Sequence, residues 1–117
     1  MMEISKRFRF EACHSLPHLP ENHKCRKLHG HSYEIVVHVQ GEVDEAMGWF
    51  IDYADISEAI APIIAHKLDH QNLNETLGFK TTAENIAVWL YGSLKKKINV
   101  SCIEVRETPT SNVVYRP

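Results

Sequence analysis

The sequence predicts an α+β fold in which an antiparallel β-sheet is backed by two helices. Two stretches, residues 4–14 and 29–41, alternate apolar and polar side chains with the period of a half-buried strand. Residues 56–68, and a stretch that begins near residues 81–82, instead space their apolar side chains as an amphipathic helix does. Strands that come first and helices that follow are typical of an α+β domain. With 117 residues and no internal repeat or linker, the chain is expected to form a single domain over residues 1–117.

Both predicted long strands have one apolar face that carries histidine at one end. In the first strand this face comprises Ile4, Phe8, Phe10, Ala12 and His14. In the second it comprises His29, His31, Tyr33, Ile35, Val37 and Val39. The opposite faces are polar or mixed, as in an antiparallel sheet with one solvated side. Residues 15–28 between the strands contain two prolines and four charged residues, and are predicted to form a long loop of the kind that is usually functional.

The remaining elements follow in chain order. Residues 49–52 are predicted to form a short strand, and Pro62 is expected to kink or break the first helix. The second helix is predicted to begin within residues 81–84, because a Thr followed three residues later by Glu is a capping box. Residues 103–107 alternate as a third long strand, and residues 112–115 are predicted to be a last short one.

Composition and charge exclude several classes of protein. The chain is 44% hydrophobic and 24% charged, which is ordinary for a globular protein and argues against disorder. A net charge of -2 gives no basic field for nucleic acid. No apolar run approaches the ~18 residues that a membrane span needs, and residues 1–10 lack the apolar region of a signal peptide. Three cysteines are too few for a disulfide framework. We therefore expect a cytoplasmic protein without a nucleic-acid or membrane partner.

Histidine is the unusual residue: there are eight, and five of them lie within residues 1–31. In a strand, His29 and His31 point to the same side about 7 Å apart along the backbone. Pairing of the two long strands could bring His14 opposite them. Each histidine alone could be surface or core filler, but three neutral imidazoles with a fourth position open are the pattern of a catalytic zinc site. The sequence therefore predicts a zinc site formed by His14, His29 and His31.

Cys25 lies four residues before His29, between Lys24 and the pair Arg26-Lys27. Electropositive surroundings favour the reactive thiolate, so Cys25 is a candidate catalytic residue. The same spacing would also suit a fourth zinc ligand that closes the site. Sequence alone leaves both interpretations open.

Two further sets of polar residues are candidates for the same site. Asp69 precedes His70 at the end of the first predicted helix, and a carboxylate can orient an imidazole for proton transfer. Adjacent helical residues do not face each other, however, so the two are expected to contact different partners. Glu107 is predicted at an inward position of its strand, where a carboxylate needs a partner. That partner could be an arginine or a ligand with paired N–H donors.

These motifs together resemble the 6-pyruvoyltetrahydropterin synthase family over nearly the whole chain. The segments that carry the resemblance are FEACHSL, Cys25-x-x-x-His29-Gly30-His31, GWFIDY, LDHQNLN, TTAEN and the strand with Glu107. The resemblance implies the tunnelling fold, in which the sheets of several subunits join into β-barrels. It implies a homohexamer of two stacked trimers with active sites between subunits.

The resemblance also implies a role for each candidate residue. The implied zinc ligands are His14, His29 and His31, and the implied catalytic residues are Cys25, Asp69 and His70. The implied pterin-binding residues are Glu107, Thr81 and Thr82, with Glu107 holding the 2-amino and N3 groups of the ring.

The implied activity is that of a zinc-dependent lyase acting on 7,8-dihydroneopterin triphosphate. The spacing of three residues between Cys25 and His29 resembles that of the carboxy-forming branch. This branch releases acetaldehyde and triphosphate and serves queuosine (7-deazaguanine) biosynthesis. Pyruvoyl-forming members typically have one more residue at this point. Two alternatives are a pyruvoyl-forming enzyme with the same site and, more remotely, a non-catalytic protein in which Cys25 closes a structural zinc site.

Overall fold

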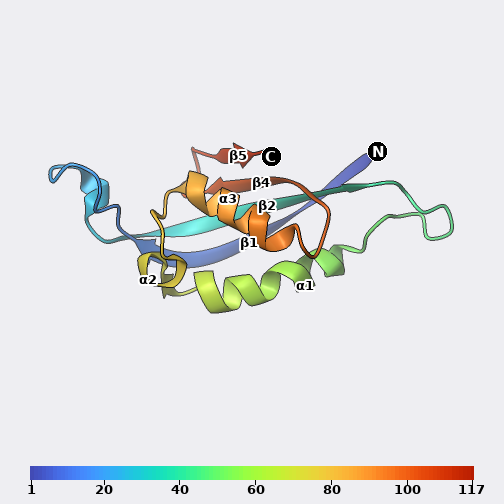
Figure 1. Cartoon of the computed structure of the whole chain (residues 1–117), viewed down its shortest axis with the longest axis horizontal. Coiled ribbons are helices and arrows are strands. Elements are labelled where there is room, and N and C mark those ends of the chain that lie inside the picture. Colours follow the sequence, from blue (N-terminus) through green and yellow to red (C-terminus); the bar gives the residue numbers. More distant parts are fainter.

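Two long strands form the spine of an elongated molecule (Figure 1). They are β1 (Met2–His14) and β2 (His29–Gly41), which pair antiparallel along their full length in the computed structural model of all 117 residues. β4 (Val100–Arg106) pairs antiparallel with β2, and β5 (Val113–Tyr115) with β4. At the other edge β3 (Gln71–Asn72) runs parallel to β1, so the strand order is β3-β1-β2-β4-β5. The predicted α+β fold is confirmed, whereas the short parallel β3 was not predicted.

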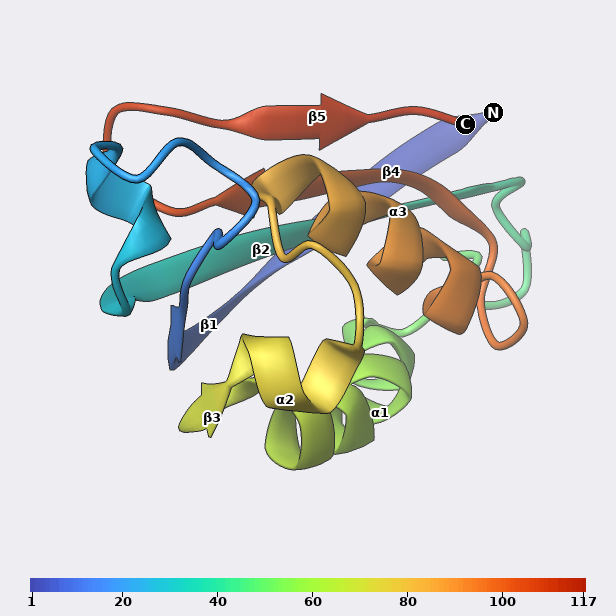
Figure 2. The same cartoon turned by 60° about the vertical axis from the view of Figure 1, so that its left-hand side comes forward.

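The helices cover one face of this sheet (Figure 2). They are α1 (Tyr53–Ile63), the short α2 (Leu73–Leu77) and α3 (Ala83–Leu94). The inward face of β2 and the facing sides of the helices meet in a core of 19 buried residues, as the period-two and helical patterns predicted. A fully buried Leu, Ile or Val side chain contributes roughly 1.5–3 kcal/mol. No helix combines the length and the apolar character needed to cross a membrane.

Residues 49–52 do not form the predicted strand. Only one isolated bridge is present, between Asp44 and Trp49. Asp52 instead caps α1, with its carboxylate accepting the N–H of Ala54 at 2.8 Å. The apolar run was misleading because Phe50 packs its ring over Gly41, where a Cβ would stand only 2.6 Å from the ring.

Pro62 neither ends nor visibly breaks α1, which continues to Ile63. The hydrogen-bond pattern changes immediately afterwards, and residues Ile64–Leu68 form a π-helical segment, η2. A proline lacks the N–H that would complete the preceding turn. The widened segment that follows keeps Leu68 fully buried.

The second predicted helix begins where the sequence places it, but without the expected capping box. Thr82 is the N-cap of α3, and its hydroxyl accepts the N–H of Asn85 at 3.2 Å. Thr81 is buried and is engaged elsewhere, so Glu84 does not close a capping box with it. The end of β1, the start of β2 and the start of α3 thus meet at one end of the molecule, beside the loop of residues 15–28.

Candidate metal centre

Strand pairing brings the three predicted histidines together. His14 and His29 are direct partners in the β1–β2 register, and His31 follows on the same face. The ring centroids lie 4.6 Å apart for His14–His29, 5.2 Å for His14–His31 and 4.9 Å for His29–His31. One ring nitrogen of each lies within 4.8 Å of those of the other two. The convergence predicted from the sequence is confirmed.

Backbone carbonyls orient two of the three rings. His14 Nδ1 donates to the carbonyl of Thr81 at 2.9 Å, and His29 Nδ1 donates to the carbonyl of Lys27 at 2.7 Å. A carbonyl only accepts, so each Nδ1 carries the proton and each Nε2 lone pair is free. Thr81 also offers its hydroxyl at 3.0 Å from His14 Nδ1, a role that sequence reasoning missed because it spans 67 positions.

The free nitrogens fit a metal ion. His14 Nε2 and His31 Nε2 are buried and have no hydrogen-bond partner. Leaving a buried polar atom unpaired costs about 1–3 kcal/mol, and coordination to a cation would satisfy both. Neutral imidazoles with their second nitrogen held by a carbonyl are the ligand set that zinc prefers.

Burial keeps the imidazoles of His14 and His31 neutral. It lowers the pKa of His14 to about 4, opposed by the Thr81 carbonyl and reinforced by His29 and His31. The pKa of His31 is also lowered, by burial and then by His29. Neutral rings are the form that coordinates a metal.

Tyr33 lies directly behind the histidines and was interpreted from the sequence only as a core residue. It is fully buried, with its ring stacked on Phe10 at 4.8 Å and 5.4 Å from the ring of His31. Its hydroxyl has no hydrogen-bond partner. Burial raises its pKa far above the usual range, followed by the effect of Glu107 and then Cys13, so the hydroxyl stays protonated.

Glu107 stands beside the metal centre just after the end of β4. Its Oε2 lies 3.5 Å from His31 Nε2, and its side chain is 25% exposed. Burial, followed by the nearby Glu84 carboxylate, raises its pKa, while His29 and the N–H of Ala83 act in the opposite direction. No arginine pairs with it, because the neighbouring Arg106 pairs with Glu34. Of the two predicted partners, the arginine is therefore absent, and the carboxylate is available for a ligand with N–H donors.

Cys25 lies outside the group of three histidines. It sits half-buried in a single 3-10 turn, η1 (Lys24–Arg26). The carbonyl of Cys25 accepts the N–H of Leu16 at 2.9 Å, and Arg26 closes the loop through the carbonyls of Pro17 and Leu19. The three histidines that could hold a metal ion come together without the Cys25 thiol.

Asp69 and His70 face each other, contrary to expectation. The π-helical segment ends at Leu68, Asp69 is extended and His70 has a left-handed φ of 58°. This turn brings His70 Nδ1 to 3.0 Å from Asp69 Oδ2. Asp69 Oδ1 accepts the N–H of Glu11 at 3.0 Å, and this bond, followed by His70, lowers the pKa of Asp69.

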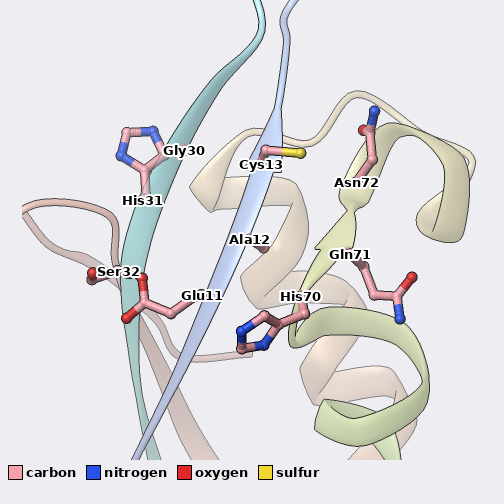
Figure 3. A pocket seen from close by; sticks show the side chains of 9 residues that line it. All are labelled: Glu11, Ala12, Cys13, Gly30, His31, Ser32, His70, Gln71 and Asn72. Carbon is pink, nitrogen blue, oxygen red and sulfur yellow. Dashed lines mark hydrogen bonds between the residues drawn. The ribbon is translucent and has the colours of Figure 1, made fainter.

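The Asp69–His70 pair lies on the other side of β1 from the histidine cluster. His70 borders a hollow of about 500 Å³ that His31 also lines, and β1 runs between the two residues (Figure 3). His70 is 79% exposed, and no hydrogen bond or ion pair joins Cys25 to either residue of the pair. Within one chain, the predicted metal ligands therefore lie together with Thr81 and Glu107. The predicted catalytic residues do not lie together, because Cys25 is in the loop and Asp69 and His70 follow the π-helical segment.

Known proteins resemble the chain over nearly its full length. A sequence model of the family described as 6-pyruvoyl tetrahydropterin synthase matches residues 3–117. The 6-carboxy-5,6,7,8-tetrahydropterin synthase of Synechocystis is 36% identical, covering 98% of this chain and 93% of that protein. The human 6-pyruvoyl tetrahydrobiopterin synthase is 33% identical, covering 97% and 90%. The structure of the Caenorhabditis elegans 6-pyruvoyl tetrahydropterin synthase superimposes with a TM-score of 0.88 at 25% identity, covering 99% of this chain and 95% of that one.

Proposed function

Because the chain belongs to the 6-pyruvoyl tetrahydropterin synthase family, we propose that it is a 6-carboxy-5,6,7,8-tetrahydropterin synthase. This zinc-dependent carbon–carbon lyase would convert 7,8-dihydroneopterin triphosphate to 6-carboxy-5,6,7,8-tetrahydropterin, releasing acetaldehyde and triphosphate, in queuosine biosynthesis. The observation that carries the proposal is the cluster of three converging imidazoles, two of them oriented by backbone carbonyls, beside a half-buried carboxylate that lacks an arginine partner. The spacing of Cys25 and His29 favours the carboxy-forming reaction.

His14, His29 and His31 would hold the zinc ion through one nitrogen each. When bound, zinc supplies Lewis-acid chemistry, lowering the pKa of the substrate's side-chain hydroxyls and polarising the carbonyl that forms there. The chain's own contribution is to keep His14 and His31 neutral by burial, and to aim the rings of His14 and His29 through the carbonyls of Thr81 and Lys27.

Glu107 would bind the pterin by accepting hydrogen bonds from its 2-amino and N3 groups. Its position fits this role because the carboxylate is half-buried and lies against His31, next to the metal centre. The hydroxyl of Thr81 is already engaged with His14, and that of Thr82 with the N–H of Asn85. These two residues would therefore border the ring mainly through their backbone and methyl groups.

Cys25 as thiolate would take the proton from the substrate's side-chain carbon, and His70 would pass protons while Asp69 orients it. Carbon–carbon cleavage would then follow as a retro-aldol step. Since Cys25 and His70 do not meet within one chain, we propose that a neighbouring subunit supplies the Asp69–His70 pair. This supports active sites between subunits of a homohexamer of two stacked trimers, in a cytoplasmic enzyme.

Product analysis tests the proposal. The zinc-loaded protein is incubated with 7,8-dihydroneopterin triphosphate, and the products are identified by mass spectrometry. Acetaldehyde with 6-carboxytetrahydropterin is the expected result. A pyruvoyl product without acetaldehyde would instead support the second candidate, a pyruvoyl-forming enzyme with the same site. The 33% identity to the human 6-pyruvoyl tetrahydrobiopterin synthase is the observation in its favour. No turnover, together with unfolding on chelation, would support a structural zinc site closed by Cys25.

A further inference from the structure

Asn74 contacts Ser15, one of the two residues that connect the metal centre to the Cys25 loop, the other being Leu28 before His29. It is the second residue of α2, and its side-chain amide grips the backbone of Ser15 from both sides. The N–H of Ser15 donates to Asn74 Oδ1 at 2.8 Å, and Asn74 Nδ2 donates to the carbonyl of Ser15 at 2.8 Å. These two bonds join positions 59 residues apart.

The amide continues the β-ladder after β3 has ended. Cys13 pairs with Asn72 in the parallel β1–β3 register, so Ser15 and Asn74 lie two positions further along the two segments. There α2 has begun, and the side chain provides the donor and acceptor that a strand backbone would have offered. Asn74 is itself fixed, because its N–H is capped by Asn72 Oδ1 and the adjacent Leu73 is fully buried.

Ser15 lies between the histidine cluster and the segment that contacts Cys25. On one side it follows the metal ligand His14, which Thr81 already holds. On the other it precedes Leu16, whose N–H donates to the carbonyl of Cys25 at 2.9 Å. The remaining turn and side-chain hydrogen bonds of residues 16–27 stay within the loop or reach His29. The direction in which the loop leaves the sheet therefore depends on the two bonds to Asn74.

We propose that Asn74 is a positioning residue that sets the placement of Cys25 relative to the metal ligands. This inference rests on the proposed function, in which Cys25 acts on a substrate held by the metal and Glu107. Misplacing a reacting group by about 1 Å can cost about 100-fold in rate. Ligand binding that does not involve the loop should be unaffected.

The test compares Asn74→Ala with Asn99→Ala. Asn99 makes the same kind of bond, from its Nδ2 to the carbonyl of Gln40 at 2.8 Å, also across 59 positions but at the remote end of the sheet. We expect Asn74→Ala to lower kcat about 10–100-fold with KM changed less than about twofold, and to retain zinc. We expect Asn99→Ala to keep wild-type kcat. Asn74→Asp, which keeps the acceptor but sets a carboxylate against the Ser15 carbonyl, should behave as Asn74→Ala and serves if that variant does not fold.

A second measurement does not depend on turnover. Cys25 in Asn74→Ala should be alkylated by iodoacetamide at least several-fold faster than in the wild type, measured by peptide mass spectrometry, because the loop is released. Unchanged kcat and unchanged alkylation in Asn74→Ala would overturn the inference while leaving the proposed function intact. An equal loss of kcat in Asn99→Ala would also overturn it, because the effect would then be general destabilisation. If the wild type does not turn over the substrate, the proposed function fails, and equal alkylation rates would then overturn the positioning role by themselves.

Discussion

Replacing Glu107 by Gln isolates the hydrogen bonds expected between this carboxylate and a pterin. The two side chains have nearly the same shape, so packing against His31 and the start of α3 is preserved. The amide has one oxygen and one NH2 group where the carboxylate has two acceptors. Whichever way the amide is oriented, one acceptor is replaced by a donor that faces either the ligand's N–H groups or the N–H of Ala83.

The expected loss follows from the setting of the carboxylate. Glu107 is only 25% exposed, so water compensates poorly for a mismatched bond. A hydrogen bond to a charged group contributes about 1.5–3 kcal/mol, which corresponds to roughly 10–150-fold weaker binding. Because burial and Glu84 raise the pKa of Glu107, wild-type affinity should fall as the pH drops through that raised value, and the variant should lack this dependence.

Isothermal titration calorimetry with a pterin that lacks the triphosphate measures the contribution of these hydrogen bonds to the affinity for the ring. Glu84→Gln is the matched control, because it removes a neighbouring carboxylate from the start of α3 that is not expected to bind the ring. Its affinity should stay near that of the wild type. Unchanged pterin binding in Glu107→Gln, or an equal loss in both variants, would refute the assignment of Glu107 as the pterin acceptor.

Four further changes test the rest of the site. His29→Ala should lose most bound zinc while the protein remains folded, and full occupancy by metal analysis would contradict the three-histidine site. Cys25→Ala should retain zinc while turnover falls about 10²–10⁴-fold; wild-type turnover or zinc-free protein would contradict its role as base. Tyr33→Phe removes an unpaired buried hydroxyl, so urea unfolding of the metal-free protein should show stability unchanged or raised by up to about 1 kcal/mol, and a clear loss would mean that the hydroxyl has a partner. The lowered pKa of Asp69 gives stability that is present above its usual value of 3.8 and is lost as the pH falls, so Asp69→Asn should be less stable at neutral pH but equal to wild type in acid; a deficit that persists in acid would contradict this.

The sheet and the histidine cluster could be predicted from the sequence because both depend on local periodicity. Alternation over β1 and β2 identified the inward faces, and once the strands pair in register, His14 and His29 must be neighbours. The same reasoning failed for residues 49–52, where an apolar run packs against Gly41 without extending the sheet. It placed the start of α3 correctly but left the N-cap open between Thr81 and Thr82, because two consecutive threonines are equivalent as caps.

What could not be predicted depends on contacts between distant positions. Thr81 could be distinguished from Thr82 only by knowing that its carbonyl and hydroxyl meet His14, 67 positions away. The contact between Asp69 and His70 required the left-handed turn at His70, which no helical pattern indicates. Asn74 stands in the sequence only as the last residue of the segment LDHQNLN, and nothing there indicates its contact with Ser15.

The division of the candidate site between strand ends on one side and a loop and sheet edge on the other has a physical reason. The groups that must be desolvated and aimed before substrate arrives, namely the imidazoles and Glu107, lie at the ends of paired strands, where ladder bonds and the Thr81 carbonyl fix them. The groups expected to move protons, Cys25 and His70, lie in a loop and at a sheet edge, where a side chain can approach water or another subunit. A thiolate fixed against three imidazoles would become a fourth ligand and close the metal to substrate. By holding Ser15, one backbone step from His14, Asn74 would direct the Cys25 loop while the thiol stays outside the group of three histidines.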